Sequence, residues 1–241
     1  MDRAAENRLS ENAVHKPNKA CKTAVLVSGG GTNLQALIDY EKTQADCPYR
    51  IEAVFSDTKK AYAIERACKA GIRTEIVSPY AILGAQGAAQ ASKNEKRQAV
   101  SKRILALCKE RGIELIVLAG FLTVLSGKLI DEYEGRIINL HPALLPDFGG
   151  EGMWGHHVHK AVLASGKKES GCTVHFVNSG CDTGKIILQK KIPVLPGDTP
   201  ETLAARLAPE EHKAIVEAVC AVAGTIGNTA AHTAAVQPLG S

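Results

Sequence analysis

With 241 residues and 45% hydrophobic side chains, the chain is long enough to bury the core of one ordinary domain with tails. Its net charge of +4, from 29 basic against 25 acidic residues with no basic tract, argues against a nucleic-acid partner. No segment approaches the ~20 apolar residues of a membrane span, and the polar N-terminus has no apolar run typical of a signal peptide. The seven cysteines include no C-x-x-C pair, so we expect reduced thiols in a cytoplasmic protein that does not engage a membrane.

The two ends differ in composition from the middle. Residues 1–21 are polar and lack hydrophobic periodicity, which predicts a loosely held arm. Residues 224–241 are rich in Ala, Thr and Gly and predict a tail, or at best a weakly docked segment. The ordered domain is therefore expected to span residues 22–223.

Short apolar runs alternate with amphipathic segments through the first part of the domain. The predicted strands are 24–28, 51–55, 73–77, 115–119 and 136–140. The predicted helices are 33–42, 61–70, 94–111 and 157–164. Gly71 and Gly112 are expected to end two of these helices, because glycine adopts the left-handed conformation at a helix C-terminus.

The last part of the domain predicts a hairpin and a helix. Strands 172–177 and 186–194 are joined by residues 178–185, too short for a crossover helix, so the pair is expected to be antiparallel. The final helix is expected to start with Thr199 as N-cap and Pro200 at its first position, and to run toward residue 222. Together these elements predict an α/β fold, a doubly wound, mostly parallel sheet with a C-terminal antiparallel hairpin.

A glycine-rich loop, from Ser28 to Asn33, connects the first strand to the first helix. It is not a Walker loop, because no Lys-Ser/Thr follows, and Leu34 stands where a dinucleotide fingerprint needs its third glycine. Backbone N–H groups at a helix N-terminus favour an anion, so a phosphate monoester fits better than a dinucleotide. A tight turn with Asn33 as a helix cap is the alternative.

The residues richest in chemistry are Asn139 and His141, on one side of a predicted strand, and Asp182, on a later Gly-bounded turn. Pro142 takes the chain out of regular strand pairing directly after His141. An amide donor, an imidazole acid or base, and a carboxylate that sets the imidazole proton suit acyl transfer. Since ligands gather at the carboxyl ends of parallel strands, we expect these side chains and the glycine loop to share one cleft.

Other polar residues leave alternatives open. The histidines at positions 156, 157 and 159 lack a fuller ligand set, so we expect no metal site. His175 either lines the cleft or is a satisfied, half-buried residue. The segment 148–157 is either a mobile lid or packs onto the core.

These motifs together resemble the phosphoribosylglycinamide formyltransferases, within the folate-dependent formyltransferase superfamily. The Asn-x-His-Pro segment marks the superfamily, and the glycine loop followed by Asn-Leu-Gln-Ala narrows it to the purine enzyme. The resemblance extends over about residues 21–222 and is carried by Val27 to Ala36, Leu118 to Phe121, Asn139 to Pro146, Gly171 to Phe176, Asp182 to Gly184, and Glu211 with His212.

The resemblance implies transfer of the formyl group of 10-formyltetrahydrofolate, a co-substrate, to the glycyl amine of 5′-phosphoribosylglycinamide, without a metal. It implies Asn139, His141 and Asp182 as the catalytic set. The implied substrate-binding residues are Gly30, Gly31, Thr32, Asn33 and Glu211. The implied folate-binding residues are Phe121, Leu122, Thr123, Val124, Leu125, Asn139, Asn178 and Asp182. The implied partners are small molecules, and the protein is expected to be a monomer or homodimer.

The sequence departs from the family pattern at several places. Thr123 stands where many relatives carry Arg, segment 148–157 is longer than in the shortest relatives, and Pro209 predicts a kink in the last helix before Glu211. The alternatives are a formyltransferase with another acceptor such as methionyl-tRNA or an amino sugar, a formyltetrahydrofolate hydrolase, and a non-catalytic folate- or nucleotide-binding relative. An enzyme that acts on methionyl-tRNA would need a further, basic C-terminal domain, and the hydrolase would usually carry an N-terminal regulatory domain; we expect neither.

Overall fold

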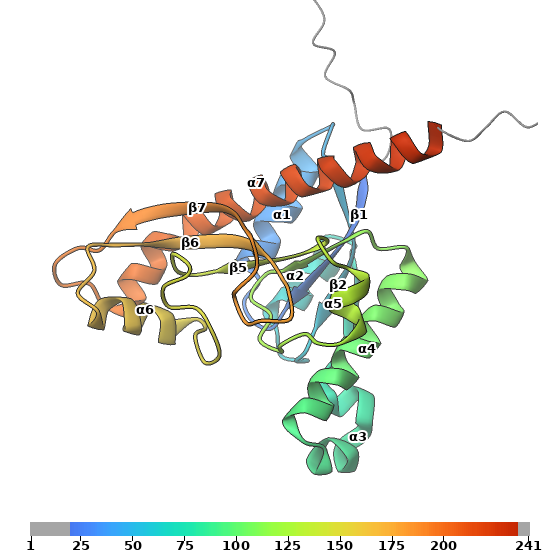
Figure 1. Ribbon diagram of the computed structural model, residues 1–241, viewed down its shortest axis with the longest axis horizontal. Helices are drawn as coiled ribbons and strands as arrows, with labels where there is room; N and C mark the ends of the chain where they lie inside the picture. The colour runs from blue at the N-terminus through green and yellow to red at the C-terminus, as the bar shows by residue number, and fades with distance from the viewer. Residues whose placement is uncertain (1–19, 236–241) are drawn as a thin grey trace, which may run out of the picture.

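A computed structural model of the chain describes residues 20–235 (Figure 1). Its centre is a seven-stranded sheet with the order β3-β2-β1-β4-β5-β6-β7. The strands are β1 (Cys21–Val27), β2 (Tyr49–Ser56), β3 (Arg73–Ile76), β4 (Leu115–Leu118), β5 (Ile137–His141), β6 (Glu169–Phe176) and β7 (Ile186–Pro193). The helices are α1 (Thr32–Thr43), α2 (Tyr62–Lys69), α3 (Pro79–Gln90), α4 (Lys93–Arg111), α5 (Lys128–Glu132), α6 (His156–Ala164) and α7 (Pro200–Ala235).

The pairing of the strands confirms the predicted fold class. The first five strands pair in parallel, whereas β6 pairs antiparallel with both β5 and β7. Strand β1 lies between β2 and β4, so the strand order reverses there. Loops that leave β1 and β4 diverge at this reversal, which is where open α/β sheets form ligand clefts.

Each face of the sheet is covered by its own core. Val25 and Val27 of β1 pack in the cluster that includes α1, α2, α6 and α7, whereas Ala24 and Leu26 pack with α4 and α5. This alternation is the two-residue period of a strand buried on both faces. It explains why β1 appears in the sequence as an unbroken apolar run.

The predicted helix ends are largely confirmed. Gly71 and Gly112 have φ angles of 74° and 62°, the left-handed region in which glycine carries no steric cost. Helix α4 begins with a capping box, in which the Ser92 hydroxyl accepts from the Glu95 N–H and the Glu95 carboxylate accepts from the Ser92 N–H. Helix α7 begins at Pro200, as predicted.

Three features differ from the predictions. Helices α3 and α5 were not predicted, and α7 continues past residue 222 to Ala235. The Ala-rich segment that composition favoured as a tail therefore forms the last turns of a helix, because alanine has the highest helix propensity. The predicted arm, residues 1–21, lies outside the described residues except for its last two positions.

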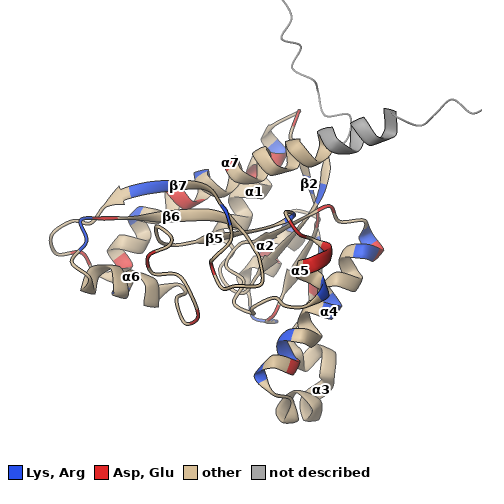
Figure 2. Ribbon diagram, in the orientation of Figure 1, with Lys and Arg blue, Asp and Glu red and all other residues tan. Residues whose placement is uncertain are grey.

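Charged residues are spread over several elements (Figure 2). Figure 2 shows Lys and Arg on α4 and β7 at well-separated places, with Asp and Glu on α5. Within residues 20–235, no helix is both long and apolar enough to cross a membrane.

Candidate active site

A cleft of about 670 Å³ opens at the carboxyl ends of β4 and β5. Its walls also come from segment 150–155, from the β6–β7 turn and from α7. The predicted site residues that line it are Asn33, Phe121, Leu122, Thr123, Val124, Leu125, Asn139, His141, Asn178, Asp182 and Glu211. Gly30, Gly31 and Thr32 lie next to Asn33 in the chain but are not among the lining residues.

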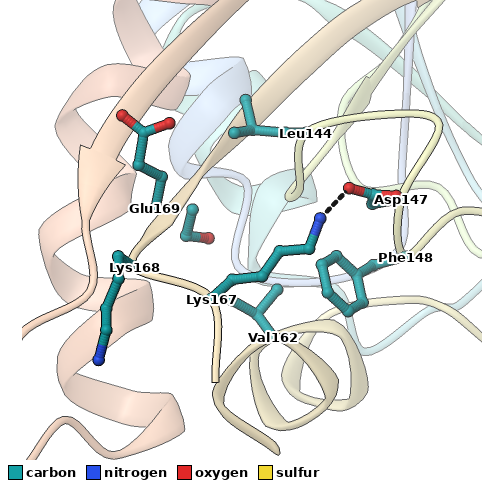
Figure 3. A pocket seen from close by; sticks show the side chains of 8 residues that line it. Leu144, Asp147, Phe148, Val162, Lys167, Lys168 and Glu169 are labelled. Carbon is teal, nitrogen blue, oxygen red and sulfur yellow. Dashed lines mark hydrogen bonds and ion pairs between the residues drawn. The ribbon is translucent and has the colours of Figure 1, made fainter. Parts of the chain in front are cut away.

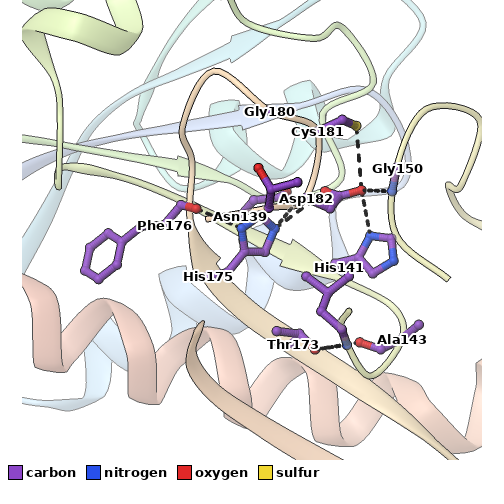
Figure 4. A network of polar contacts seen from close by, with 12 residues as sticks. Asn139, His141, Ala143, Gly150, Thr173, His175, Phe176, Gly180, Cys181 and Asp182 are labelled. Atoms are coloured by element: carbon purple, nitrogen blue, oxygen red, sulfur yellow. Dashed lines mark hydrogen bonds and ion pairs between the residues drawn. The ribbon is translucent and has the colours of Figure 1, made fainter. Parts of the chain in front are cut away.

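Strand pairing brings Asn139 against His175. The two residues are opposite each other in the antiparallel β5–β6 pair, and Nδ2 of Asn139 lies 3.1 Å from Nε2 of His175 (Figure 4). Nδ1 of His175 lies 2.8 Å from the Phe176 carbonyl oxygen, which can only accept. Nδ1 therefore donates to that carbonyl, and Nε2 faces both the Asn139 amide and the Asp182 carboxylate.

Asp182 lies at the centre of the polar contacts (Figure 4). Its carboxylate accepts the Gly150 N–H at 3.0 Å and lies 3.5 Å from Nδ2 of Asn139. The two histidines face different carboxylate oxygens, with Nδ1 of His141 3.6 Å from Oδ2 and Nε2 of His175 3.5 Å from Oδ1. Burial acts to raise the Asp182 pKa, but the contacts with His175, His141 and Gly150 outweigh it and lower that pKa, so the group is an anion at neutral pH.

His141 is held with one ring nitrogen on each of two acceptors. Nε2 donates to the Phe148 carbonyl at 2.8 Å, and Nδ1 faces the Asp182 carboxylate. Burial lowers the pKa of His141 and outweighs the opposing effect of Asp182. The ring is therefore neutral at neutral pH, yet both of its nitrogens face groups that stabilise the protonated form, which suits a proton carrier.

The segment after Pro142 is fixed by a buried hydroxyl. Oγ1 of Thr173 donates to the Ala143 carbonyl at 2.7 Å and accepts the Leu145 N–H at 3.0 Å (Figure 4). Thr173 pairs with His141 across β5 and β6. These contacts replace strand pairing where proline cannot continue it, and they hold the end of β5 that carries His141.

Asn33 and Glu211 meet across α1 and α7. Nδ2 of Asn33 donates to the Glu211 carboxylate at 3.3 Å, while Oδ1 of Asn33 is buried without a partner. Burial raises the pKa of Glu211, and the bond from Asn33 only partly offsets this. The N-cap of α1 is Gly31, with no side-chain bond, so the alternative of Asn33 as a cap is wrong.

The wall of the cleft that contains residues 121–125 has contacts that spacing alone did not indicate. Oγ1 of Thr123 donates to the Asp57 carboxylate at 2.8 Å, so this side chain is anchored directly after the end of β2. Lys93 and Arg97 of α4 both bond Oε1 of Glu151, at 2.8 Å and 2.5 Å. The side chains of Lys93, Arg97 and Glu151 all line the cleft.

The family is decided by comparison with known proteins. The sequence profile described as "Formyl transferase" matches residues 21–219. The chain belongs to the formyl transferase family. The resemblance carried by its motifs is therefore confirmed, and the fold agrees with it.

Named members of the formyl transferase family are similar over most of this chain. Phosphoribosylglycinamide formyltransferase of Escherichia coli (strain K12) is 37% identical over 188 residues, 78% of this chain and 80% of that protein. The trifunctional purine biosynthetic protein adenosine-3 of Drosophila pseudoobscura pseudoobscura is 39% identical over 215 residues, 89% of this chain but only 14% of that protein. Glycinamide ribonucleotide transformylase 1 from Symbiobacterium toebii has 37% identity and a TM-score of 0.74, with 86% of this chain and 89% of that chain covered.

The histidines of α6 and a second hollow are not part of the polar contacts around Asp182. Among the described residues, no group of three or more His, Cys, Asp or Glu side chains could hold a metal ion. His159 is buried at the cleft, whereas His156 lies 3.4 Å from Glu201. A second hollow of about 460 Å³ lies between α6 and the start of β6, where Lys167 pairs with Asp147 (Figure 3). None of the predicted site residues lines that hollow.

Sequence reasoning missed several contributors to the site. The Gly150 N–H and the Thr173 hydroxyl act through contacts between segments 28 to 32 residues apart. His175 was left between two interpretations, and the structure places it in the cleft. The alternation of His175 with Val174 and Phe176 was the available signal, since it puts His175 on the face of β6 opposite those side chains.

Proposed function

We propose that this chain transfers the formyl group of 10-formyltetrahydrofolate to the glycyl amine of 5′-phosphoribosylglycinamide, a step of purine synthesis. The observation that carries the proposal is the convergence of Asn139, His141 and Asp182 at one end of a cleft. Membership of the formyl transferase family supports a folate-derived formyl donor.

The reaction needs an oxyanion stabilised and one proton moved. The glycyl amine attacks the formyl carbon, a C–N bond forms, and the carbonyl oxygen becomes an oxyanion. The Asn139 amide donates a hydrogen bond to that oxygen. His141 takes up the proton lost by the amine and donates a second bond from Nε2, in place of its bond to the Phe148 carbonyl. The proton that leaves the attacking nitrogen passes by way of Asp182 to His141, and His141 gives it to N10 of the folate as the bond between N10 and the formyl carbon breaks. Formylated product and tetrahydrofolate leave with no net gain or loss of protons.

Asp182 supports both halves of this step. As an anion beside His141, it favours the imidazolium at the moment when the oxyanion forms. Its contact with the Gly150 N–H and its left-handed backbone, with φ of 56°, fix the carboxylate in one place. Preorganised groups of this kind need no rearrangement as charge develops.

The two substrates are assigned to opposite sides of the catalytic set. The glycine loop, with Gly30, Gly31, Thr32 and Asn33, is proposed to hold the phosphate, and Glu211 the sugar or glycinamide end. The segment from Phe121 to Leu125, with Asn178, is proposed to line the pterin pocket. The apolar character of most of that segment suits a flat heteroaromatic ring.

The test is a formyl-transfer assay with purified protein, 10-formyltetrahydrofolate and glycinamide ribonucleotide, beside a control without the amine. Amine-dependent release of tetrahydrofolate supports the proposal. Release without the amine would identify a hydrolase instead. No release in either reaction would contradict the proposed acceptor.

A further inference from the structure

The glycine loop is held from one side by helix α2. The Ala63 N–H donates to the Gly29 carbonyl at 3.1 Å, and Nε of Arg66 donates to the Gly30 carbonyl at 2.8 Å. A Cβ on Gly31 would lie 2.5 Å from the Cβ of Ala63, so α2 also packs directly on the third glycine. Two consecutive carbonyls of the loop thus point at the first turns of α2.

This arrangement sets the direction of the opposite groups. In a trans peptide the C=O of one residue and the N–H of the next point opposite ways. Because the Gly29 and Gly30 carbonyls face α2, the N–H groups of Gly30 and Gly31 face away from it. The Gly31 carbonyl accepts the Gln35 N–H within α1, which leaves the Thr32 N–H directed out of the helix N-terminus. Successive N–H groups directed outward in this way form an anion-binding concavity.

Arg66 is the charged member of this arrangement. Its Nη1 donates to Oε1 of Gln35 at 3.2 Å, and its guanidinium lies 5.0 Å from the centre of the Tyr62 ring. The guanidinium is therefore fixed by the loop, by α1 and by an aromatic face at once. Among the described residues that line the cleft, the Lys and Arg side chains are Lys93 and Arg97, and both bond Glu151. A phosphate at the loop therefore depends on charge from outside the cleft lining.

We infer that Arg66 is a positioning residue, which holds the Gly30 carbonyl so that the loop N–H groups receive the substrate phosphate. The inference rests on the proposed function, since the phosphate belongs to the proposed acceptor. Removal of the guanidinium frees the Gly30–Gly31 peptide plane to rotate and removes a positive charge beside the loop. Both effects weaken binding of a phosphate monoester and leave the formyl-transfer groups in place.

The test compares Arg66→Met with Lys69→Met, which removes a second cation that lies over the same Tyr62 ring. Each variant is assayed with glycinamide ribonucleotide and with the phosphate-free riboside. Arg66→Met is expected to raise KM for the ribonucleotide about 10- to 100-fold, the effect of a charge-assisted contact, with kcat within about threefold. The kcat/KM for the riboside and the KM for 10-formyltetrahydrofolate stay at the wild-type values, as do all constants of Lys69→Met.

An equal loss on both acceptors, or no loss on the ribonucleotide, would overturn the inference. Titration calorimetry with ribose 5-phosphate separates it from the proposed function, because it needs no turnover. If the wild-type protein transfers no formyl group yet binds ribose 5-phosphate more tightly than Arg66→Met does, the proposed function fails and the role of Arg66 stands. Equal binding by the two proteins would contradict that role. Arg66→Lys, which keeps one donor, is expected to fall between them and serves if Arg66→Met does not fold.

Discussion

Asp182 contacts polar groups from several separate segments of the cleft. It contacts a backbone N–H from segment 148–157, an amide from β5 and imidazoles from β5 and β6. These partners lie on separate parts of the chain, so the carboxylate also fixes their mutual geometry. A change at this residue is therefore expected to affect the chemical step before it affects binding.

Asp182→Asn is expected to lower kcat by about 10²–10³-fold, because a neutral amide neither accepts the amine proton nor stabilises protonated His141. The volume is unchanged, so the loss should fall on kcat rather than on either KM. Steady-state formyl transfer measures it. Asp147→Asn is the matched control, since Asp147 is exposed and pairs with Lys167 outside the cleft. A loss of less than threefold for Asp182→Asn would remove it from the proposed mechanism.

Residue type and spacing were enough to single out Asn139, His141 and Asp182, because a polar pair at a buried strand end is unusual. The supporting contacts could not be obtained in the same way. The register that places His175 opposite Asn139 depends on how β6 pairs, and its partner lies 36 residues away. The pairing of Glu151 with Lys93 and Arg97 likewise spans more than 50 residues.

At the scale of elements, prediction succeeded where burial imposes a pattern. The apolar runs of β1 and β4 and the glycines after α2 and α4 carry direct signals. Helix α3 carries none, because it is uncharged and contains Gly84, whose φ of 72° interrupts the helix. Helix α5 has five residues, too few for a periodicity to be recognised.

Pro209 lies inside α7, where it removes one backbone hydrogen bond. Pro209→Ala restores a donor to the Ala205 carbonyl and is expected to raise the free energy of unfolding by about 2–3 kcal/mol. Proline in a helix interior costs ~3 kcal/mol, and removal of that cost stabilises the folded state. The unfolded chain becomes more flexible without proline, which subtracts up to ~1 kcal/mol from this gain. Urea unfolding measures the change.

Pro200→Ala is the control in the same helix. Pro200 stands at the first helical position, where its missing N–H has no partner within the helix in any case. The same substitution there is expected to give no stabilisation. Equal effects at both positions would mean that the proline in the helix interior does not strain α7.

At the scale of the whole molecule, the sheet reversal at β1 and β4 creates the cleft, and the fold buries ionisable groups around it. Burial lowers the pKa of His141, His159 and His212, and neighbouring His156 and His141 add to the shift at His159. Each of these histidines binds a proton more readily in the unfolded chain than in the folded one. Their contribution to stability is thus complete above the unfolded pKa of about 6.5 and is lost as the pH falls below it.

Glu211 acts in the opposite direction. Its pKa is raised by burial, so it costs stability as the pH rises above its unfolded value of about 4.3. Burial also raises the pKa of Glu41, so the three histidines oppose two carboxyls. Because the unfolded pKa of both carboxyls lies below pH 5, we expect the histidines to dominate and the free energy of unfolding to fall on acidification from pH 7 to pH 5. Urea unfolding at the two pH values measures it, and an unchanged value would contradict the expected role of the buried histidines.

The His159→Gln variant tests whether the buried His159 ring contributes to the loss of stability between pH 7 and pH 5. The side chain of His159 is 5% exposed, and its Nδ1 has no hydrogen-bond partner, so protonation there meets no compensating acceptor. Glutamine at this position removes one proton-binding site and is expected to reduce the loss of stability between pH 7 and pH 5. His157→Gln is the matched control, since it removes an exposed histidine two residues earlier on α6 and leaves the buried His159 ring in place. If both variants kept the full loss, the acid sensitivity would have to arise from His141, in the proposed catalytic set, and from His212 rather than from α6.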